Sequence, residues 1–231
     1  SYAAPPVRAI EVLKTKSITE IAPHVYIYDL GQNTSVIPRI SVSGKAGTSI
    51  RIIPSELLAK DGTLDRSSST QNGNRLSWWK YTLSGKSKKE NWFPLSYYQG
   101  GRYLQVELHP NEKGDMPVLE SLEGVVIHAS SESIGTFETS NELFNQIFYL
   151  VRWAQRSNMM SVMTDCPARE KLGWLEQNQL NGPALRYNYN MAPLYHKTMR
   201  DLADSQLGYG LIPSIVPEYF MAADPNVHPP T

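Results

Sequence analysis

The residues of this chain that could do chemistry gather in one short stretch, 164–177. Its carboxylates are Asp165, Glu170 and Glu176, and between them lie the guanidinium of Arg169 and the indole of Trp174. A positioned carboxyl group can transfer a proton to or from a bound substrate, and glycoside hydrolysis uses a pair of such groups. An indole offers a flat face on which a sugar ring can stack. The stretch therefore indicates a carbohydrate site at which protons are transferred.

Pro167 and Gly173 predict that this stretch is a rigid loop leading into a helix. The residue before a proline avoids helical angles, so a regular helix cannot pass through that point. Gly173 permits a second sharp change of direction, and we expect a helix to begin near Trp174. A simpler interpretation stays open, in which Arg169 and Glu170 form a surface ion pair and Trp174 is a core residue.

The order of these residues resembles the signature of a known enzyme family. The pattern Asp-Cys-Pro-x-Arg-Glu-(Lys/Arg)-x-Gly-Trp, found here at 165–174, is similar to that of the α-L-rhamnosidases. These are inverting glycoside hydrolases with an (α/α)6 toroid of helical hairpins. The resemblance implies that Glu170 is the general acid. It also implies that Asp165, Arg169 and Trp174 hold the rhamnose.

The sequence departs from the common family pattern after Trp174. Where many members have Gly-Asp, this chain has Glu176-Gln177, so Gln177 stands at the position of a second sugar-binding aspartate. Both residues remain candidates for substrate binding. In the family the general base comes from far downstream, and only a few helices are predicted after the signature. We therefore expect the chain to be the front part of a larger enzyme, to lack the base and to be inactive alone on an aryl α-L-rhamnoside.

Composition argues against several other function classes. The 22 basic and 22 acidic residues cancel, so no basic surface for nucleic acid is expected. The single cysteine, Cys166, excludes an internal disulfide, and we interpret it as a buried structural thiol. The five histidines show no ligand spacing, so we predict no metal and no cofactor. No apolar run approaches the length of a membrane span. We expect a secreted or periplasmic protein, with a cytoplasmic location as the alternative.

Short apolar runs between turn residues predict an antiparallel, jelly-roll-like β-sandwich over residues 24–134. The runs are Val25–Leu30, Ile37–Val42, Thr48–Ile53, Trp78–Leu83, Arg102–Leu108 and Val125–His128. The motifs at 28–33, 60–64 and 100–103 resemble the sandwich that precedes the toroid in α-L-rhamnosidases. Residues 1–23 are predicted to be a lead-in segment with one short strand or link.

After Thr139 the periodicity becomes helical, and we assign residues 135–231 to the N-terminal part of the toroid domain. Thr139 and Glu142 match a capping box ahead of a helix over 140–158. The apolar residues of this helix fall on one face: Leu143, Ile147, Leu150, Val151 and Ala154. Because only a few helices follow, we expect apolar helix faces in this part of the chain to lack partners and to invite association.

Two more helices are predicted downstream of the signature. One covers 174–187 and is kinked or split at Gly182-Pro183. The other runs from an Asn190 cap to Gln206. Glu218 lies in the proline-containing loop that follows, where it is a candidate for the same pocket, with a plain surface position as the other interpretation.

These observations predict a glycosidase that acts on a rhamnose-containing oligosaccharide or glycoside, without nucleic acid or membrane as a partner and with a tendency to form homo-oligomers. One alternative is a non-catalytic carbohydrate-binding protein that presents Trp78, Trp79, Tyr97 and Tyr98 on an exposed sandwich face. Another is a polysaccharide lyase acting at a rhamnose–uronic acid linkage, in which Arg169 would neutralise the uronic acid.

Overall fold

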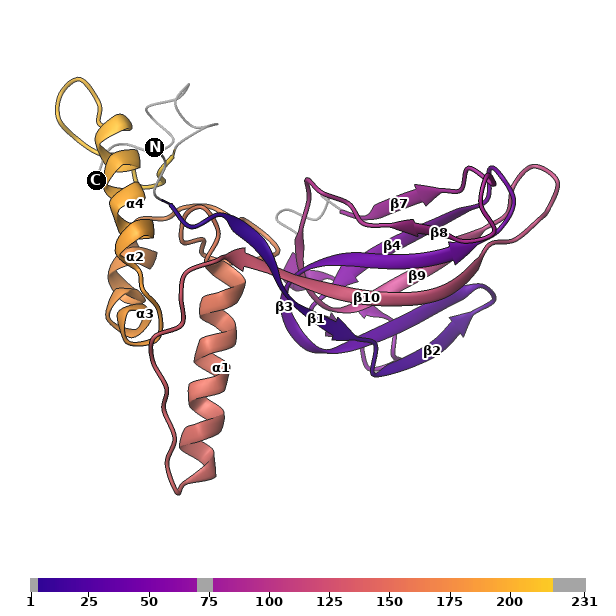
Figure 1. The fold of residues 1–231 in the computed structure, drawn as a ribbon, viewed down its shortest axis with the longest axis horizontal. Coiled ribbons are helices and arrows are strands. Elements are labelled where there is room, and N and C mark those ends of the chain that lie inside the picture. The colour runs from indigo at the N-terminus through magenta and orange to yellow at the C-terminus, as the bar shows by residue number, and fades with distance from the viewer. Residues whose placement is uncertain (1–3, 70–76, 218–231) are drawn as a thin grey trace. The chain divides into compact units, whose positions relative to one another are not determined.

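The computed structural model of the protein describes residues 4–69 and 77–217. The chain divides into two compact units. One comprises residues 9–127 and is built from strands, and the other comprises His128 onward together with the start of the chain up to Arg8 and carries the helices (Figure 1). Each unit has its own hydrophobic core.

Eight strands form one sheet in the order β1-β10-β3-β9-β4-β7, and β2 and β8 pair with β3 beside that path. A short hairpin, β5-β6, stands apart. Residues 1–23 therefore contribute two strands rather than the single strand or link that the sequence predicted. The elements of this region are β1 (Val7–Lys14), β2 (Ser17–Ala22), β3 (Val25–Ser43), β4 (Ser49–Ser55), β5 (Leu57–Leu58), β6 (Leu64–Asp65), the 3-10 turn η1 (Ser67–Ser69), β7 (Trp79–Thr82), β8 (Glu90–Trp92), β9 (Gln99–His109) and β10 (Val118–Ala129).

The 19-residue strand β3 belongs to two layers of this sheet. Its first part, Val25–Asp29, pairs with β2 on one side and with β9 on the other. Its second part, 36–43, pairs with β10 and, around Ser41, with β8. A strand that changes neighbours in this way folds a continuous antiparallel sheet into a sandwich. The predicted β-sandwich is confirmed.

A bulge marks the change of layer within β3. The ladder with β9 is interrupted between Asp29 and Thr34. Gly31 takes a left-handed φ of 78°, and its amide N–H donates to Asp29 Oδ1 at 2.6 Å. The prediction of two strands separated by a turn is therefore wrong, because these residues make a bulge inside one strand.

The sandwich core consists of side chains at alternate positions of its strands. Ile50 and Ile52 of β4 and Leu104 and Val106 of β9 have no exposed surface. Alternation of this kind places every second side chain on the inner face of a layer. The apolar runs were thus a sound guide to the core.

The aromatic residues at 78–79 and 97–98 do not form the exposed platform predicted for a binding module. Trp79 is a core residue at 4% exposure, and its indole N–H donates to the backbone carbonyl of Tyr97 at 3.2 Å. Trp78 is half exposed, and the Arg51 guanidinium lies 4.7 Å from the centre of its ring. Tyr98 is partly buried. A buried Trp79 cannot stack on a glycan, so that version of the binding-module hypothesis is wrong.

The helical unit contains α1 (Glu142–Asn158), α2 (Glu176–Leu180), α3 (Gly182–Asn188) and α4 (Ala192–Asp204). Its core joins the end of α1 to α3 and α4 through residues such as Met159, Leu185 and Leu194. The predicted split at Gly182-Pro183 is confirmed, because Pro183 lies in the first turn of α3. Proline is tolerated there since the first turn needs no N–H donor.

Both predicted helix caps are wrong by one or two residues. Asn141 caps α1 by accepting the N–H of Leu143 at 3.0 Å, whereas Thr139 bonds to the side chain of Asn145. No side chain caps α4, which begins after Met191. A capping-box pattern identifies the region of a helix start better than the residue, because Ser, Thr, Asn and Asp compete for the position.

The apolar face of α1 is exposed in the part of the chain that the structure describes, in agreement with the prediction that helix faces here lack partners. Leu143 is 60% exposed and Leu150 is 71% exposed, and the buried residues of this helix are Gln155 and Ser157. The side-chain N–H of Asn188 donates to Gln155 at 2.9 Å, so a polar contact fastens α1 to α3. Over residues 4–69 and 77–217, no helix is both long and apolar enough to cross a membrane.

Candidate active site

The signature stretch forms a loop anchored to the end of α1. The backbone N–H of Thr164 donates to the backbone carbonyl of Asn158 at 2.9 Å, and its hydroxyl donates to the Asn158 side-chain oxygen at 3.0 Å. Met159 and Met163 form an isolated antiparallel bridge between these points. The chain thus leaves the helix, turns back on itself and starts the loop from a fixed position.

Asp165 closes the loop across its base. Its backbone N–H donates to the carbonyl of Leu172 at 3.1 Å, and its Oδ1 accepts the N–H of Leu172 at 2.9 Å. Its Oδ2 has no hydrogen bond to the residues that the structure describes. Asp165 therefore holds the loop with one oxygen while the other is available to a ligand hydroxyl.

Glu170 is held by three contacts, each from a different residue of the loop. Its backbone N–H donates to Cys166 Sγ at 3.1 Å. Its Oε2 accepts the indole N–H of Trp174 at 3.0 Å, and its Oε1 faces Arg169 Nη2 at 3.2 Å. The Glu170 side chain is 16% exposed and that of Arg169 is 48% exposed. The carboxyl group is therefore oriented by its neighbours and still reaches solvent.

Cys166 is partly buried rather than buried as predicted. Its sulfur accepts the N–H of Glu170 one turn further along, at 3.1 Å. This contact satisfies a backbone donor at the tip of the loop, where a regular helix is absent. The thiol thus has a structural role in the geometry of the loop.

A short antiparallel pairing fixes the far end of the loop. Val216 N–H donates to Gly173 O at 3.0 Å, and Leu175 N–H donates to Ser214 O at 3.0 Å. A Cβ placed on Gly173 would lie 2.3 Å from the carbonyl oxygen of Val216, so only glycine fits at this close approach. No sequence signal predicts the backbone pairing at 214–216, although Glu218 of the same loop was a candidate for the pocket.

Lys171 shapes the backbone of this loop, and the sequence did not predict that role. Its φ of 58° is left-handed, and burial lowers the pKa of its ammonium group from 10.5 to about 8. An L-residue in this conformation costs free energy that the surrounding contacts must offset. The backbone turn at Lys171 reverses the chain between Glu170 and the Leu172 amide that binds Asp165.

The remaining predicted site residues lie at the start of α2 or beyond the described part. Glu176 is exposed in the first turn of α2. Gln177 is partly buried, and its side-chain oxygen accepts from the Asn181 side chain at 3.1 Å. Glu218 lies outside the described residues. The structure thus brings Glu170, Arg169 and Trp174 into direct contact, joins Asp165 to the same loop, and leaves Glu176 outside that hydrogen-bonded group.

This arrangement orients a carboxyl group beside groups that can hydrogen-bond a neutral, hydroxyl-rich ligand. A partly exposed carboxyl group held by an indole N–H and a guanidinium has a defined direction, which a general acid requires. Carboxylate, guanidinium and amide groups beside it can hydrogen-bond ligand hydroxyls. Within 4–69 and 77–217, no group of three or more His, Cys, Asp or Glu side chains is placed to hold a metal ion.

Comparison with protein families matches both parts of the chain to one kind of enzyme. The bacterial alpha-L-rhamnosidase concanavalin-like domain matches residues 19–128. The bacterial alpha-L-rhamnosidase 6 hairpin glycosidase domain matches residues 132–229. The signature loop lies within the second match, and β3 and β9 lie within the first.

Individual relatives agree with the family matches. An alpha-L-rhamnosidase of Streptomyces avermitilis is 34% identical over 92% of this chain, and one of Formosa agariphila is 31% identical over 90%. The chain spans about a fifth of the length of these relatives, 20% and 22%.

Solved structures show the same similarity in three dimensions. The alpha-L-rhamnosidase of Dictyoglumus thermophilum is 35% identical, with a TM-score of 0.85, over 94% of this chain and 24% of its own. The Streptomyces avermitilis alpha-L-rhamnosidase complexed with L-rhamnose is 32% identical, with a TM-score of 0.86, over 96% of this chain and 21% of its own.

Proposed function

Because both of its domains match one family, the chain belongs to the α-L-rhamnosidases, and we propose that the protein is an inverting glycosidase that releases terminal α-L-rhamnosyl residues. The antiparallel sandwich is the concanavalin-like domain of that family, and the helices that follow are the start of the six-hairpin glycosidase domain. The observation that carries the proposal is the position of Glu170 in the signature loop, held by Trp174 and Arg169. The relative with L-rhamnose bound supports the choice of sugar.

In the proposed mechanism, Glu170 protonates the glycosidic oxygen as the bond to the aglycone breaks. Asp165 Oδ2 and Arg169 bind hydroxyl groups of the rhamnose, and the indole of Trp174 packs on its ring. Gln177 and Glu176 extend this hydrogen-bonding set at the start of α2. Glu218 is a further candidate for this pocket. A positioned general acid contributes about 10²–10⁴-fold to the rate, so Glu170 is the residue on which turnover depends most.

The general base is proposed to come from another part of the glycosidase domain. In an inverting enzyme the two carboxyl groups lie about 6.5–9.5 Å apart, which leaves room for the attacking water. Asp165 already uses one oxygen to hold the loop, and it lies on the same short loop as Glu170. A carboxylate that approaches from a different element fits the required opposite face of the sugar better.

The test is Glu170→Gln in the full-length enzyme. The amide keeps the shape and the acceptor for the Trp174 N–H, but it has no proton to donate. Turnover of a natural rhamnoside should fall about 10²–10⁴-fold. An aryl rhamnoside with a good leaving group needs little protonation and should lose much less. Equal losses on the two substrates would show that Glu170 is not the acid.

Glu142→Gln is the matched control, because it makes the same chemical change in an exposed carboxylate at the start of α1, outside the residues proposed to bind the sugar. Its turnover of the two substrates should keep their wild-type ratio. Proton NMR of the first sugar released should show the anomer opposite to that of the substrate. Release of the same anomer would refute inversion even if Glu170 proved essential.

A further inference from the structure

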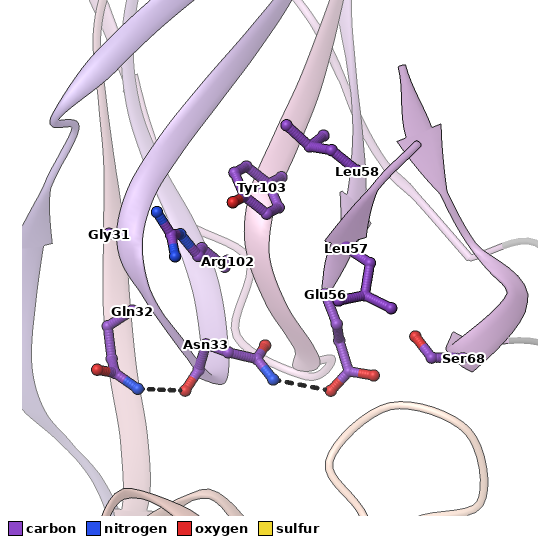
Figure 2. A pocket seen from close by; sticks show the side chains of 9 residues that line it. All are labelled: Gly31, Gln32, Asn33, Glu56, Leu57, Leu58, Ser68, Arg102 and Tyr103. Carbon is purple, nitrogen blue, oxygen red and sulfur yellow. Dashed lines mark hydrogen bonds between the residues drawn. The ribbon is translucent and has the colours of Figure 1, made fainter. Parts of the chain in front are cut away.

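A pocket of about 590 Å³ lies on the sandwich at the bulge of β3. Its walls come from β3, β5, η1 and β9, which are distant in sequence. Figure 2 shows Asn33 and Glu56 pointing toward each other across it, joined by a hydrogen bond of 3.1 Å from Asn33 Nδ2 to Glu56 Oε1. Its volume falls within the range of about 300–1,000 Å³ that is usual for small-molecule sites.

The bulge explains why polar side chains reach this pocket. Between Asp29 and Thr34 the chain leaves its ladder with β9, so these residues are not constrained to alternate across the sheet. Gln32 and Asn33 line the pocket from this segment, and the Gln32 amide donates to the carbonyl of Asn33 at 2.9 Å. Two side-chain amides, each both donor and acceptor, thus stand together at one wall.

Arg102 brings a positive charge to the pocket wall, and a neighbour neutralises it. Its guanidinium donates from Nε to Asp29 Oδ1 and from Nη2 to Asp29 Oδ2, both at 2.8 Å. This bidentate pairing is a strong and directional form of ion pair. The bond to Arg102 also holds the pKa of Asp29 below its usual value of 3.8, so the pair is fully ionised at neutral pH. An anion approaching the pocket would meet a guanidinium that is already paired and the carboxylate of Glu56.

The wall also offers an apolar surface beside these polar groups. Leu57 is 50% exposed and follows Glu56 directly, and Leu58 and Tyr103 line the same pocket. The Arg102 guanidinium lies 5.0 Å from the centre of the Tyr103 ring, so the two side chains contact each other. Hydroxyl partners at one rim and an apolar surface beside them match a pyranose, which has a polar edge and an apolar C–H face.

The pocket is held in shape before any ligand binds. The Ser55 hydroxyl donates to the carbonyl of Leu57 at 3.0 Å, and β5 pairs with β6 through Leu57 and Leu58. The Asp29–Arg102 pair ties the base of the bulge to β9. A preformed site loses less conformational freedom on binding than a mobile one, so weak individual contacts suffice.

We propose that this pocket is a binding site for a neutral pyranoside, carried by the sandwich and separate from the residues assigned to catalysis. Asn33 and Glu56 bind ring hydroxyls, Gln32 supplies a further amide, and Leu57 contacts the C–H face. The ligand class follows from the pocket itself and does not depend on the role of Glu170. Such a site would let the sandwich bind a sugar by itself, independently of the signature loop.

The experiment is an NMR titration of the 231-residue chain with methyl α-L-rhamnopyranoside. The side-chain amide signals of Gln32 and Asn33 and the backbone amide of Leu57 should shift together and saturate in the millimolar range. Methyl α-D-glucopyranoside and inorganic phosphate are titrated separately. A saturable shift with either glycoside supports the proposal. Shifts with phosphate and not with the glycosides would overturn it, as would no saturable shift with any of the three.

Matched variants then locate the binding. Asn33→Ala removes one hydrogen-bonding side chain and should weaken binding about two- to tenfold. Glu112→Ala is the control for Glu56→Ala, because Glu112 is also a surface carboxylate and lines a different pocket of about 610 Å³. Glu56→Ala should weaken binding and Glu112→Ala should not. Equal affinity in Glu56→Ala, Asn33→Ala and the unaltered chain would refute the site.

The same titration with the Glu170→Gln chain separates this proposal from the proposed function. Binding at the sandwich pocket should be unchanged in that variant, since the two sets of residues belong to different units. If Glu170 proves not to be the acid, the shifts at Gln32, Asn33 and Leu57 still show whether the pocket binds a pyranoside. If these shifts disappear in Glu170→Gln, the sugar was bound at the signature loop and the proposal is wrong.

Discussion

Gly173→Ala should open the signature loop at its pairing with residues 214–216. The new Cβ would stand 2.3 Å from the carbonyl oxygen of Val216, whereas its contact with Val162 Cγ2 is an ordinary 3.4 Å. The obstacle is backbone, so no side chain can swing aside to relieve it. Overpacking of this kind costs about 1–3 kcal/mol. Displacing the chain would also weaken the hydrogen bonds from Val216 N–H and Leu175 N–H, each worth about 0.5–1.5 kcal/mol.

These contributions together amount to about 2–6 kcal/mol of local stability, the sum of the two ranges for one clash and two hydrogen bonds. Native-state hydrogen exchange is the appropriate assay, because a chain of two units need not unfold in one step. Since about 1.36 kcal/mol is a factor of ten, exchange of the Val216 and Leu175 amides should accelerate at least about thirtyfold. Amides in the core strands β4 and β9 should keep their wild-type rates.

Gly208→Ala is the control, because a Cβ there would meet nothing within 4 Å. It should leave exchange at Val216 and Leu175 unchanged. If Gly173→Ala also leaves both amides protected as in the wild type, then the close approach of the two segments does not exist and Val216 does not hold the end of the loop. In the full-length enzyme the same substitution should lower kcat/KM for rhamnosides, because the loop that orients Glu170 would no longer be fixed at its far end.

Burial lowers the pKa of Lys171 to about 8, so the unfolded chain, in which that pKa is 10.5, binds more protons than the native chain between these pH values. Charged Lys171 therefore lowers the free energy of unfolding below pH 8. Lys171→Met should melt at a higher temperature than the wild type at pH 7, and the difference in melting temperature should narrow as the pH is raised to about 10. A melting difference that does not change with pH would contradict this origin. Trp174→Phe keeps a ring but removes the N–H that binds Glu170, so the full-length enzyme should lose turnover more than rhamnose affinity, whereas Trp174→Ala should lose affinity as well. Steady-state kinetics and calorimetric titration with L-rhamnose distinguish the two variants. A large fall in melting temperature with unchanged affinity would instead make Trp174 a core residue. The exposed apolar face of α1 should promote self-association of the 231-residue chain. The double variant Leu143→Lys, Leu150→Lys should sediment more like a monomer than the unaltered chain. Identical sedimentation of the two proteins would show that this face does not mediate the association.

The signature was readable from the sequence because its chemistry is carried by residue types close together in the chain. Pro167 and Gly173 predicted a loop, and a loop is present between α1 and α2. What could not be read was how the loop is closed. The contact of Gly173 with Val216 and the left-handed turn at Lys171 depend on tertiary packing, and neither has a local pattern.

The sandwich was predictable in outline and not in its connections. Apolar runs located most of β3, β4 and β9 and only the last part of β10, because burial on one face imposes a period of two. The residues Gly31-Gln32-Asn33 favour a turn and a bulge equally well, so the sequence could not show that β3 continues through them. The pocket at this bulge was missed for a related reason, since its residues come together only when β3, β5 and β9 are placed.

The first helix shows a different limit. Periodicity identified which face of α1 is apolar, but it does not indicate which segment of the protein packs against that face. Leu143 and Leu150 are exposed among the described residues although their pattern is that of a buried face. An amphipathic pattern indicates that a helix needs a partner, and it does not indicate which segment supplies one.

The sharing of β3 between two layers has a consequence for how the protein is made. The second half of β3, from Val36 to Ser43, finds its neighbours β8 and β10 much later in the chain. During synthesis β2 is available to pair with the first half of β3 only. The apolar residues Ile40 and Val42 of the second half, which are buried in the folded protein, stay exposed until β8 and β10 have been made. Unpaired apolar strands of this kind are the segments most prone to aggregate before folding is complete. The segment 36–43 is therefore the part of the sandwich whose aggregation we expect to compete most with folding until β10 has been made.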